Sequence, residues 1–83
     1  MNTSEHYQLY HFTSCVYCLK ARFQLSRMGI ELPLRNIREN PAYREELIKG
    51  GGKSQVPCLR IEDENNGVRW LYESRDIVKY FRN

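Results

Sequence analysis

The stretch YQLYHFTSCVYC, residues 7–18, decides the fold. Its first half, residues 7–12, is rich in aromatic side chains that alternate loosely with polar ones, which is typical of a β-strand. Its second half ends in the pair Cys15 and Cys18, which opens a run with the apolar spacing of a helix. A thiol at a helix N-terminus faces unpaired backbone N–H groups and the positive end of the helix dipole, and both favour the thiolate. Since the thiolate is the reactive form of cysteine, this placement predicts a redox centre.

The helix that follows is expected over residues 16–28 and ends at Gly29. Cys18 lies three positions after Cys15, so it returns to the same side of this helix and can close a disulfide with Cys15. Two adjacent apolar stripes give the helix a broad face to bury. The stripes are Val16, Leu19 and Phe23, and Cys18, Ala21, Leu25 and Met28.

A second strand and a second helix come next. Residues 30–37 alternate between apolar and polar side chains, and Pro33 indicates that this strand lies at a sheet edge or begins late. Asn40 and Pro41 are typical of a helix start, as N-cap and first helical residue. This helix is expected to run to about Lys49 and to end at the glycines of residues 50–52. We expect it to bury Tyr43, Leu47 and Ile48.

The last third of the chain predicts a hairpin and a final helix. Strands over residues 58–61 and 68–72 flank a polar connection, residues 62–67, that ends in an Asn-Gly pair suited to a tight turn. Ser74 is expected to cap a last helix with Asp76 in its first turn. Its buried side would carry Ile77, Val78 and Phe81.

The predicted order is β-α-β-α-β-β-α. A strand-helix-strand start implies a parallel pair with a right-handed crossover, and the tight turn makes the last two strands antiparallel. The fold class is therefore α/β, with a mixed four-stranded sheet and helices on both faces, the thioredoxin-type arrangement. The cysteine pair would lie at the carboxyl end of the first strand, where open α/β sheets bind ligands.

Length and composition limit what the chain does. Its 83 residues predict one small domain spanning residues 1–83, with 41% hydrophobic and 28% charged residues. No apolar run has the length of a membrane span, and residues 1–5 lack the plan of a signal peptide, so we expect a cytoplasmic protein without membrane association. The net charge of +3 is small and dispersed, which does not favour nucleic-acid binding.

The cysteine pair has three interpretations. A structural zinc site needs a second pair of ligands, and the spare candidates, Cys58, His6 and His11, form no second knuckle. Inert core cysteines are a second interpretation, since free cysteine is often buried. The position of the pair at a strand-to-helix junction favours redox use, and the three cysteines of the chain suit a reducing compartment.

Two further segments are open to both structural and functional interpretations. Val56-Pro57 is either an ordinary trans turn at the start of a strand, or a cis-proline loop that presents the Val56 backbone to a thiol-bearing peptide. Ser74 at the last helix is an N-cap, and the same helix N-terminus next to Glu73 is also a carboxylate-binding site. Cys58 and both histidines are expected to serve packing or to face solvent, as are Trp70 and the tyrosines of the strands. Tyr17 is expected to be exposed beside Cys15.

These features together resemble the glutaredoxin family, and also the N-terminal thioredoxin-like domain of glutathione transferases, over about residues 7–81. The motifs that carry the resemblance are Cys15-Val16-Tyr17-Cys18, Gln55-Val56-Pro57 and Glu73-Ser74. The resemblance implies glutathione as co-substrate, Cys15 as the nucleophile and Cys18 as the resolving thiol. It further implies that Val56 pairs with the cysteinyl part of glutathione beside cis-Pro57, and that Glu73 and Ser74 hold the γ-glutamyl end. Gln55 and Tyr17 would line the tripeptide.

The chain departs from the family at two positions. Val16 stands where glutaredoxins usually have proline, and Phe12 stands where they often have lysine, so a cation for the thiolate or the glycyl carboxylate must come from elsewhere. Lys20, Arg22 and Lys53 are the candidates. The chain ends just after the last predicted helix, without the helical domain of a transferase, so we expect a stand-alone glutaredoxin.

The resulting hypothesis is a monomeric, glutathione-dependent thiol–disulfide oxidoreductase. Its protein partners would be disulfide-bonded or glutathionylated proteins. The alternatives are a dimer that holds an iron–sulfur cluster through Cys15 and two glutathiones, and a binding module with the fold but no activity.

Overall fold

The predicted elements form in the predicted order in the computed structural model, which describes residues 5–63 and 67–82. They are β1 (Glu5–His11), α1 (Val16–Arg27), β2 (Leu34–Asn36), α2 (Pro41–Gly51), β3 (Cys58–Asp63), β4 (Gly67–Leu71) and α3 (Ser74–Arg82).

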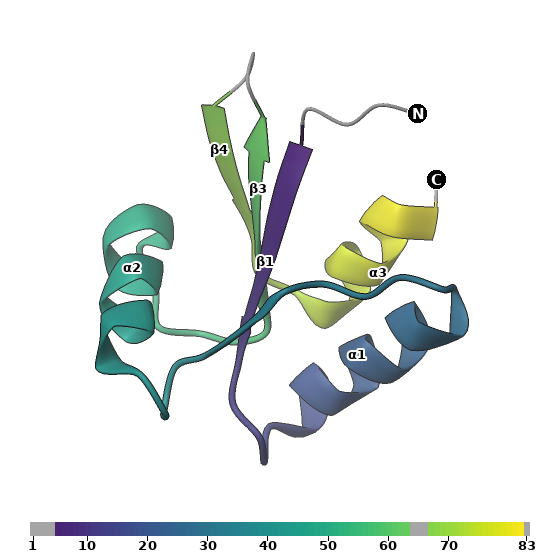
Figure 1. The fold of residues 1–83 in the computed structure, drawn as a ribbon, viewed down its shortest axis with the longest axis horizontal. Helices are drawn as coiled ribbons and strands as arrows, with labels where there is room; N and C mark the ends of the chain where they lie inside the picture. Colours follow the sequence, from purple (N-terminus) through teal and green to yellow (C-terminus); the bar gives the residue numbers. More distant parts are fainter. Residues whose placement is uncertain (1–4, 64–66, 83) are drawn as a thin grey trace.

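A mixed sheet with the strand order β2-β1-β3-β4 forms the middle layer. β1 runs parallel to β2 and antiparallel to β3, and β4 runs antiparallel to β3. α1 and α3 pack against each other on one face of the sheet, and α2 lies on the other (Figure 1). This arrangement confirms the predicted α/β fold of thioredoxin type.

The second strand is shorter than its sequence pattern predicts. β2 contains only Leu34–Asn36, directly after Pro33, and not residues 30–37. It lies at the edge of the sheet, as Pro33 indicates, because proline has no N–H to donate to a neighbouring strand. The carbonyl of Pro33 still accepts a 2.9 Å hydrogen bond from the N–H of Leu9, which continues the contact with β1.

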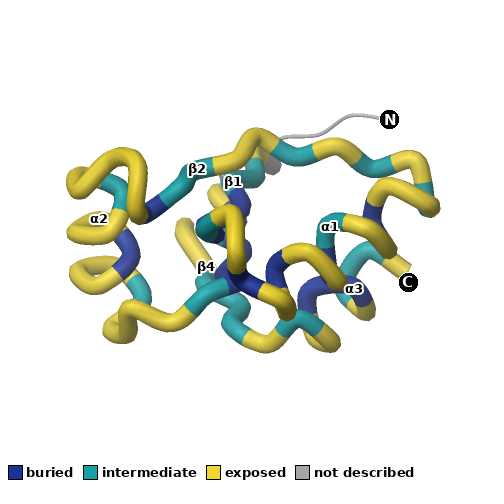
Figure 2. The backbone as a smooth tube through the Cα atoms, turned by 90° about the horizontal axis from the view of Figure 1, so that it is seen from below, coloured by how far each residue is buried: buried dark blue, intermediate teal, exposed yellow. Residues whose placement is uncertain are grey.

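The sheet separates two apolar clusters. Successive side chains of β1 point to opposite faces, so Leu9 lies in the cluster beneath α1 and α3, and Tyr10 lies in the cluster beneath α2. The first cluster contains Leu9, Ala21, Leu25, Leu59, Ile61, Ile77 and Val78, and the second contains Tyr10, Ile37, Leu47 and Cys58. Seen end-on, the buried residues lie where the helices meet the sheet, and the outer turns of the helices are exposed (Figure 2).

Only one of the two predicted apolar stripes of α1 is buried. Ala21 and Leu25 pack into the core with Cys18, as predicted. Val16, Leu19 and Phe23 are 64%, 48% and 62% exposed, so the prediction was wrong for them. The reason is that α3 packs against the side of α1 that carries Ala21 and Leu25.

The second helix extends further and buries less than predicted. Leu47 is buried and Tyr43 is half-buried, but Ile48 is exposed, contrary to the prediction. The helix continues through Gly50 and Gly51 and ends at Gly52, whose φ of 93° is left-handed. A Cβ on Gly50 would overlap the indole of Trp70, and a Cβ on Gly51 would overlap the hydroxyl of Tyr72. These glycines therefore let α2 approach the end of β4 closely.

The hairpin between β3 and β4 forms as predicted, although residues 64–66 of its connection lie outside the described residues. Gly67 has a φ of 80°, the conformation that the Asn-Gly pair predicts. Among the described residues, no helix is long and apolar enough to cross a membrane.

Candidate functional site: a cysteine pair beside a cleft

The loop that carries Cys15 is fixed at both ends. The N–H of Cys15 donates a 3.1 Å hydrogen bond to the carbonyl of Phe12, which closes the turn after β1. The side-chain amide of Asn36 donates a 3.2 Å hydrogen bond to the hydroxyl of Thr13. The loop between β1 and α1 is thus attached to the end of β2, and Cys15 is held at the carboxyl edge of the sheet.

Cys15 is the N-cap of α1. Its carbonyl accepts a 3.0 Å hydrogen bond from the N–H of Leu19, and its Sγ accepts a 3.1 Å hydrogen bond from the N–H of Cys18. The sulfur therefore occupies the position that a serine or aspartate oxygen takes in an ordinary N-cap. Both the hydrogen bond and the helix dipole stabilise negative charge at this sulfur.

Cys18 has a different environment. It is completely buried, whereas Cys15 keeps 8% of its surface exposed. The pKa of the Cys18 thiol is raised to about 12, mainly by burial and also by its hydrogen bond with Cys15. The backbone of Phe12 and the charge of Arg22 lower this pKa only in part. At neutral pH the second cysteine is a thiol inside the protein, and only the first has an exposed surface.

The six residues assigned to glutathione by resemblance all line one cleft. Its volume is about 960 Å³. They are Tyr17 from α1, Gln55, Val56 and Pro57 from the loop before β3, and Glu73 and Ser74 at the start of α3. The cysteines are not among the lining residues, but Cys15 is two positions before Tyr17 in the chain. The structure therefore brings these six residues together beside the cysteine pair.

Tyr72 fixes the loop that forms one wall of the cleft. Its hydroxyl accepts a 3.2 Å hydrogen bond from the N–H of Lys53 and donates a 3.1 Å hydrogen bond to the carbonyl of Lys53. This loop contains the peptide bond between Val56 and Pro57, which is cis. Sequence reasoning assigned Tyr72 to strand packing, but it lies after β4 and lines the cleft. The sequence feature that relates to this position of Tyr72 is the run of glycines at residues 50–52, since Gly51 leaves room for the Tyr72 hydroxyl.

The start of α3 opens into the same cleft. The carbonyl of Glu73 accepts the first helical hydrogen bond, 2.9 Å from the N–H of Ile77, so Glu73 occupies the N-cap position. Ser74, the predicted N-cap, is instead the first helical residue, so the prediction was wrong by one position. The free N–H groups of this first turn, and the positive end of the helix dipole, suit a carboxylate.

The three candidate cations lie in different places. Lys20 lines the cleft. Lys53 places its Nζ 5.3 Å from the centre of the Tyr72 ring. A fourth cation, Arg38, was not considered from sequence. Its guanidinium lies 3.8 Å from the centre of the Phe12 ring, so a positive charge does stand beside this position, where the family often has lysine.

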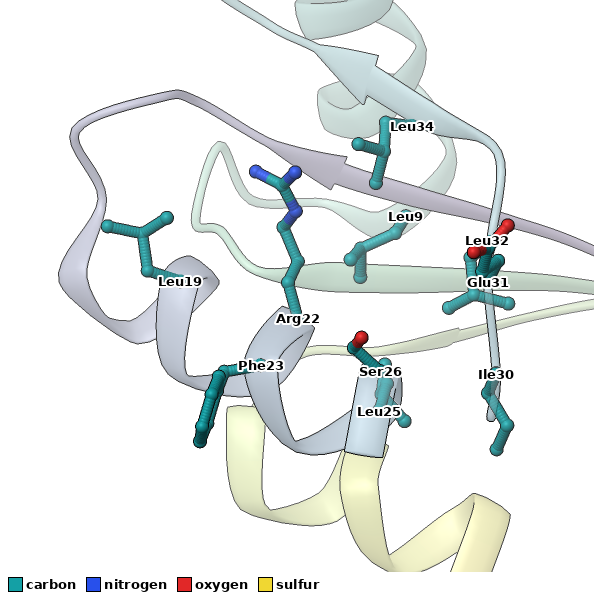
Figure 3. A pocket seen from close by; sticks show the side chains of 10 residues that line it. All are labelled: Leu9, Leu19, Arg22, Phe23, Leu25, Ser26, Ile30, Glu31, Leu32 and Leu34. Carbon is teal, nitrogen blue, oxygen red and sulfur yellow. The ribbon is translucent and has the colours of Figure 1, made fainter. Parts of the chain in front are cut away.

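Arg22 points away from the cleft, into a second groove between α1 and the segment that leads into β2 (Figure 3). This groove has a volume of about 520 Å³. Its walls are mostly apolar, with Leu19 and Phe23 on α1 and Ile30, Leu32 and Leu34 opposite. None of the residues assigned to glutathione lines it.

The remaining cysteine and the histidines lie outside the cleft. Cys58 is fully buried beneath α2, and burial raises its pKa to about 12, against a smaller opposing effect of its hydrogen bond with Tyr72. His11 is 5% exposed, and burial, followed by the charge of Arg22, lowers its pKa. His6 is exposed on β1. Within residues 5–63 and 67–82, no group of three or more His, Cys, Asp or Glu side chains could hold a metal ion.

Comparison with known sequences finds similarity to glutaredoxins. A family model described as Glutaredoxin matches residues 8–65. Glutaredoxin 3 of Escherichia coli (strain K12) is 35% identical over 60 residues, which cover 72% of each chain. Glutaredoxin 2 of the same organism is 36% identical over 73 residues, which cover 88% of this chain but only 31% of that protein.

Solved structures show the same fold at lower identity. A glutaredoxin from Brucella melitensis superposes with a TM-score of 0.62 and 19% identity, over 99% of this chain and 85% of the other. A maleylacetoacetate isomerase from Anaeromyxobacter dehalogenans with bound GSH superposes with a TM-score of 0.70 and 20% identity, over 98% of this chain and 38% of the other. The chain therefore matches a small protein almost end to end and a minor part of a larger one.

Proposed function

Because the chain belongs to the glutaredoxin family, we propose that it is a glutathione-dependent thiol–disulfide oxidoreductase. The observation that carries this proposal is the position of the Cys15 sulfur. It caps α1 and accepts the N–H of Cys18 at 3.1 Å, and the residue that carries it keeps 8% of its surface exposed. It is also next to a cleft that includes the N-terminus of α3. The proposal therefore has the Cys15 thiolate as the nucleophile and the cleft as the binding site of an anionic peptide.

The first reaction is removal of glutathione from a protein. The Cys15 thiolate attacks the glutathione sulfur of a protein–glutathione mixed disulfide, and the protein thiolate leaves and takes up a proton. Cys15 is now disulfide-bonded to glutathione. The thiolate of a second glutathione attacks this disulfide, releases glutathione disulfide and restores the Cys15 thiolate. One glutathione is oxidised and leaves as a disulfide with the glutathione that the substrate brought, and one protein thiol is formed.

The second reaction uses both cysteines. The Cys15 thiolate attacks a protein disulfide and forms a mixed disulfide with the protein, and Cys18 then attacks the Cys15 sulfur to release the reduced protein. Cys18 must first lose its proton, and burial makes that costly while Cys15 is free. Two glutathiones then reduce the Cys15–Cys18 disulfide. Since Cys18 is needed in this route alone, the two reactions are separable by mutation.

The cleft suggests how glutathione lies. The Val56 backbone beside Pro57 would pair with the cysteinyl unit, which keeps the sulfur close to Cys15. The γ-glutamyl carboxylate would lie at the first turn of α3, with Glu73 and Ser74 around it, since helix N-termini bind anions. Gln55 and Tyr17 would line the rest of the tripeptide. A neighbour solved with bound GSH supports glutathione as the ligand of the cleft.

A glutathione-coupled assay tests the proposal. The substrate is the mixed disulfide of glutathione and 2-mercaptoethanol, with glutathione and glutathione reductase supplying electrons. We expect turnover by the natural chain and by Cys58→Ala, and none by Cys15→Ser. An inactive natural chain would exclude the proposed activity and favour a binding module. A brown protein after anaerobic purification, with no turnover, would instead favour the iron–sulfur alternative.

A further inference from the structure

The cleft continues beyond the part assigned to glutathione. It follows the groove between α1 and α3, which lie side by side (Figure 1). Its walls repeat at helical spacing, with Tyr17, Lys20, Ala21 and Gln24 on α1 and Arg75, Val78, Lys79 and Arg82 on α3. Arg82 is eight residues after Ser74, which corresponds to about 12 Å along a helix. We call this extension the α1–α3 groove.

The floor and rim of the α1–α3 groove differ in character. Ala21 and Val78 form the floor, with 1% and 5% of their surface exposed, and are part of the core. The rim is made of long polar side chains. An extended peptide would therefore find a shallow apolar base between two rows of polar contacts, which suits a chain segment better than a compact ligand.

The rim is strongly cationic. Four cations line the cleft, and its only carboxylates are those of Glu73 and Asp76, at the beginning of α3. The ion pairs found within residues 5–63 and 67–82 are Arg35–Glu46 and Arg60–Glu62, which lie elsewhere. Lys79 and Arg82 thus have no carboxylate ion-pair partner in the part of the chain that the structure describes. Neighbouring like charges repel one another, so an anionic ligand would relieve this repulsion.

We infer that the α1–α3 groove binds an acidic segment of the protein substrate, next to the substrate's reactive cysteine. The inference rests on the proposed function, because a segment placed here must be joined to a sulfur that reaches Cys15. Tyr17 connects the reaction centre with the α1–α3 groove, since it follows Cys15 by two residues and also lines the cleft. A chain leaving the reaction centre over Tyr17 would pass Lys20 and run toward Lys79 and Arg82.

The consequence is selectivity by charge. Complementary charge raises the rate of encounter and rejects partners of the same sign, and salt weakens both effects. Substrates with Asp and Glu near the modified cysteine should have higher kcat/KM than neutral ones, and substrates with Lys should have lower values. Apart from its glutathione, the small substrate has only a 2-mercaptoethanol unit, which does not reach Lys79 and Arg82, so its turnover should not depend on these two charges.

The test compares three glutathionylated peptides that share the same cysteine and differ only in their flanks, which are Glu-rich, neutral or Lys-rich. At low salt we expect kcat/KM to fall in that order, with about a tenfold span from first to last, and to converge at high salt. In the variant Lys79→Gln/Arg82→Gln the span should collapse. The matched control is Arg44→Gln/Lys49→Gln on α2, which removes the same charge from exposed positions on the other face of the sheet.

Turnover of the mixed disulfide of glutathione and 2-mercaptoethanol distinguishes a failure of the inference about the groove from a failure of the proposed function. Equal kcat/KM for the three peptides, with normal turnover of this small substrate, would overturn the inference and leave the proposed function standing. An equal loss of preference in both double variants would also overturn it, because the effect would then come from net charge alone. No turnover of the small substrate by the natural chain would overturn the proposed function, and the inference with it.

Discussion

The backbone N–H of Cys18 donates a 3.1 Å hydrogen bond to the Sγ of Cys15. The same turn of helix therefore stabilises charge on the first sulfur and encloses the second one. Burial of Cys18 raises its pKa to about 12, so at neutral pH this cysteine is a thiol. The two cysteines differ in accessibility and protonation although they are three residues apart.

Alkylation by iodoacetamide should reveal this difference. Near pH 7 we expect Cys15 to be modified first, because Cys18 and Cys58 are completely buried thiols whose pKa values are raised to about 12. Raised pKa values keep both protonated until the pH approaches 12, so their labelling should increase only in strongly alkaline solution. Mass spectrometry of the digested protein gives the rate for each cysteine. Equal rates at neutral pH would contradict the assigned environments.

Replacing Cys18 by Ser should separate the two reactions. Removal of glutathione needs only Cys15 and glutathione, so Cys18→Ser should retain turnover of glutathionylated substrates. Reduction of a protein disulfide should be lost, because no second thiol resolves the mixed disulfide with the substrate. Thermal unfolding should accompany both assays, since the new hydroxyl is buried. Loss of both activities in a variant that is still folded would argue against this division of roles.

Ser74→Ala tests the glutathione end of the cleft. Ser74 is the first helical residue and not the N-cap, so we expect the free energy of unfolding to change by less than about 0.5 kcal/mol. If the hydroxyl donates to the γ-glutamyl carboxylate, the KM for glutathione should rise about 2- to 10-fold, as for one lost hydrogen bond. An unchanged KM would remove Ser74 from the site. The backbone N–H groups of the helix would then be the remaining donors.

Tyr72→Phe tests the wall of the cleft. The change removes both hydrogen bonds between the Tyr72 hydroxyl and the Lys53 backbone, at a cost of about 1 kcal/mol each in unfolding free energy. We expect the loop to lose its position beside the cleft and the KM for glutathione to rise. Tyr43→Phe on α2 is the matched control, since it makes the same chemical change at a tyrosine that packs against the same apolar cluster but does not line the cleft. A similar KM in both variants would show that Tyr72 does not position the loop.

Much of the fold follows from local signals in the sequence. The order of strands and helices, the helix start at Asn40 and the turn at Gly67 depend on residues close in the chain, and the structure has them as predicted. Pro33 likewise indicated an edge strand. The predicted bounds of β2 and α2 were less accurate, because the residue at which each element ends depends on its contacts with neighbouring segments.

What sequence could not provide depends on contacts between distant segments. Both stripes of α1 are apolar, and only the packing of α3 decides that Ala21 is buried and Phe23 exposed. Tyr72 was predicted to be a strand residue. Its hydrogen bonds with Lys53 could not be predicted, because they join segments 19 positions apart in the chain. The six residues of the cleft were found through a family resemblance, since no periodicity relates Tyr17, Gln55 and Ser74. Their convergence is a property of the fold.

The most direct test of the central claim locates the covalent intermediate. The Cys18→Ser variant is mixed with glutathione disulfide, and the modified residue is identified by mass spectrometry of the digested, acid-quenched protein. We expect one glutathione per chain, attached at Cys15, with one free glutathione released, and no adduct when Cys15 is also replaced by Ser. Adducts that persist in the double variant, or that lie on Cys58, would contradict the assignment of Cys15 as the nucleophile.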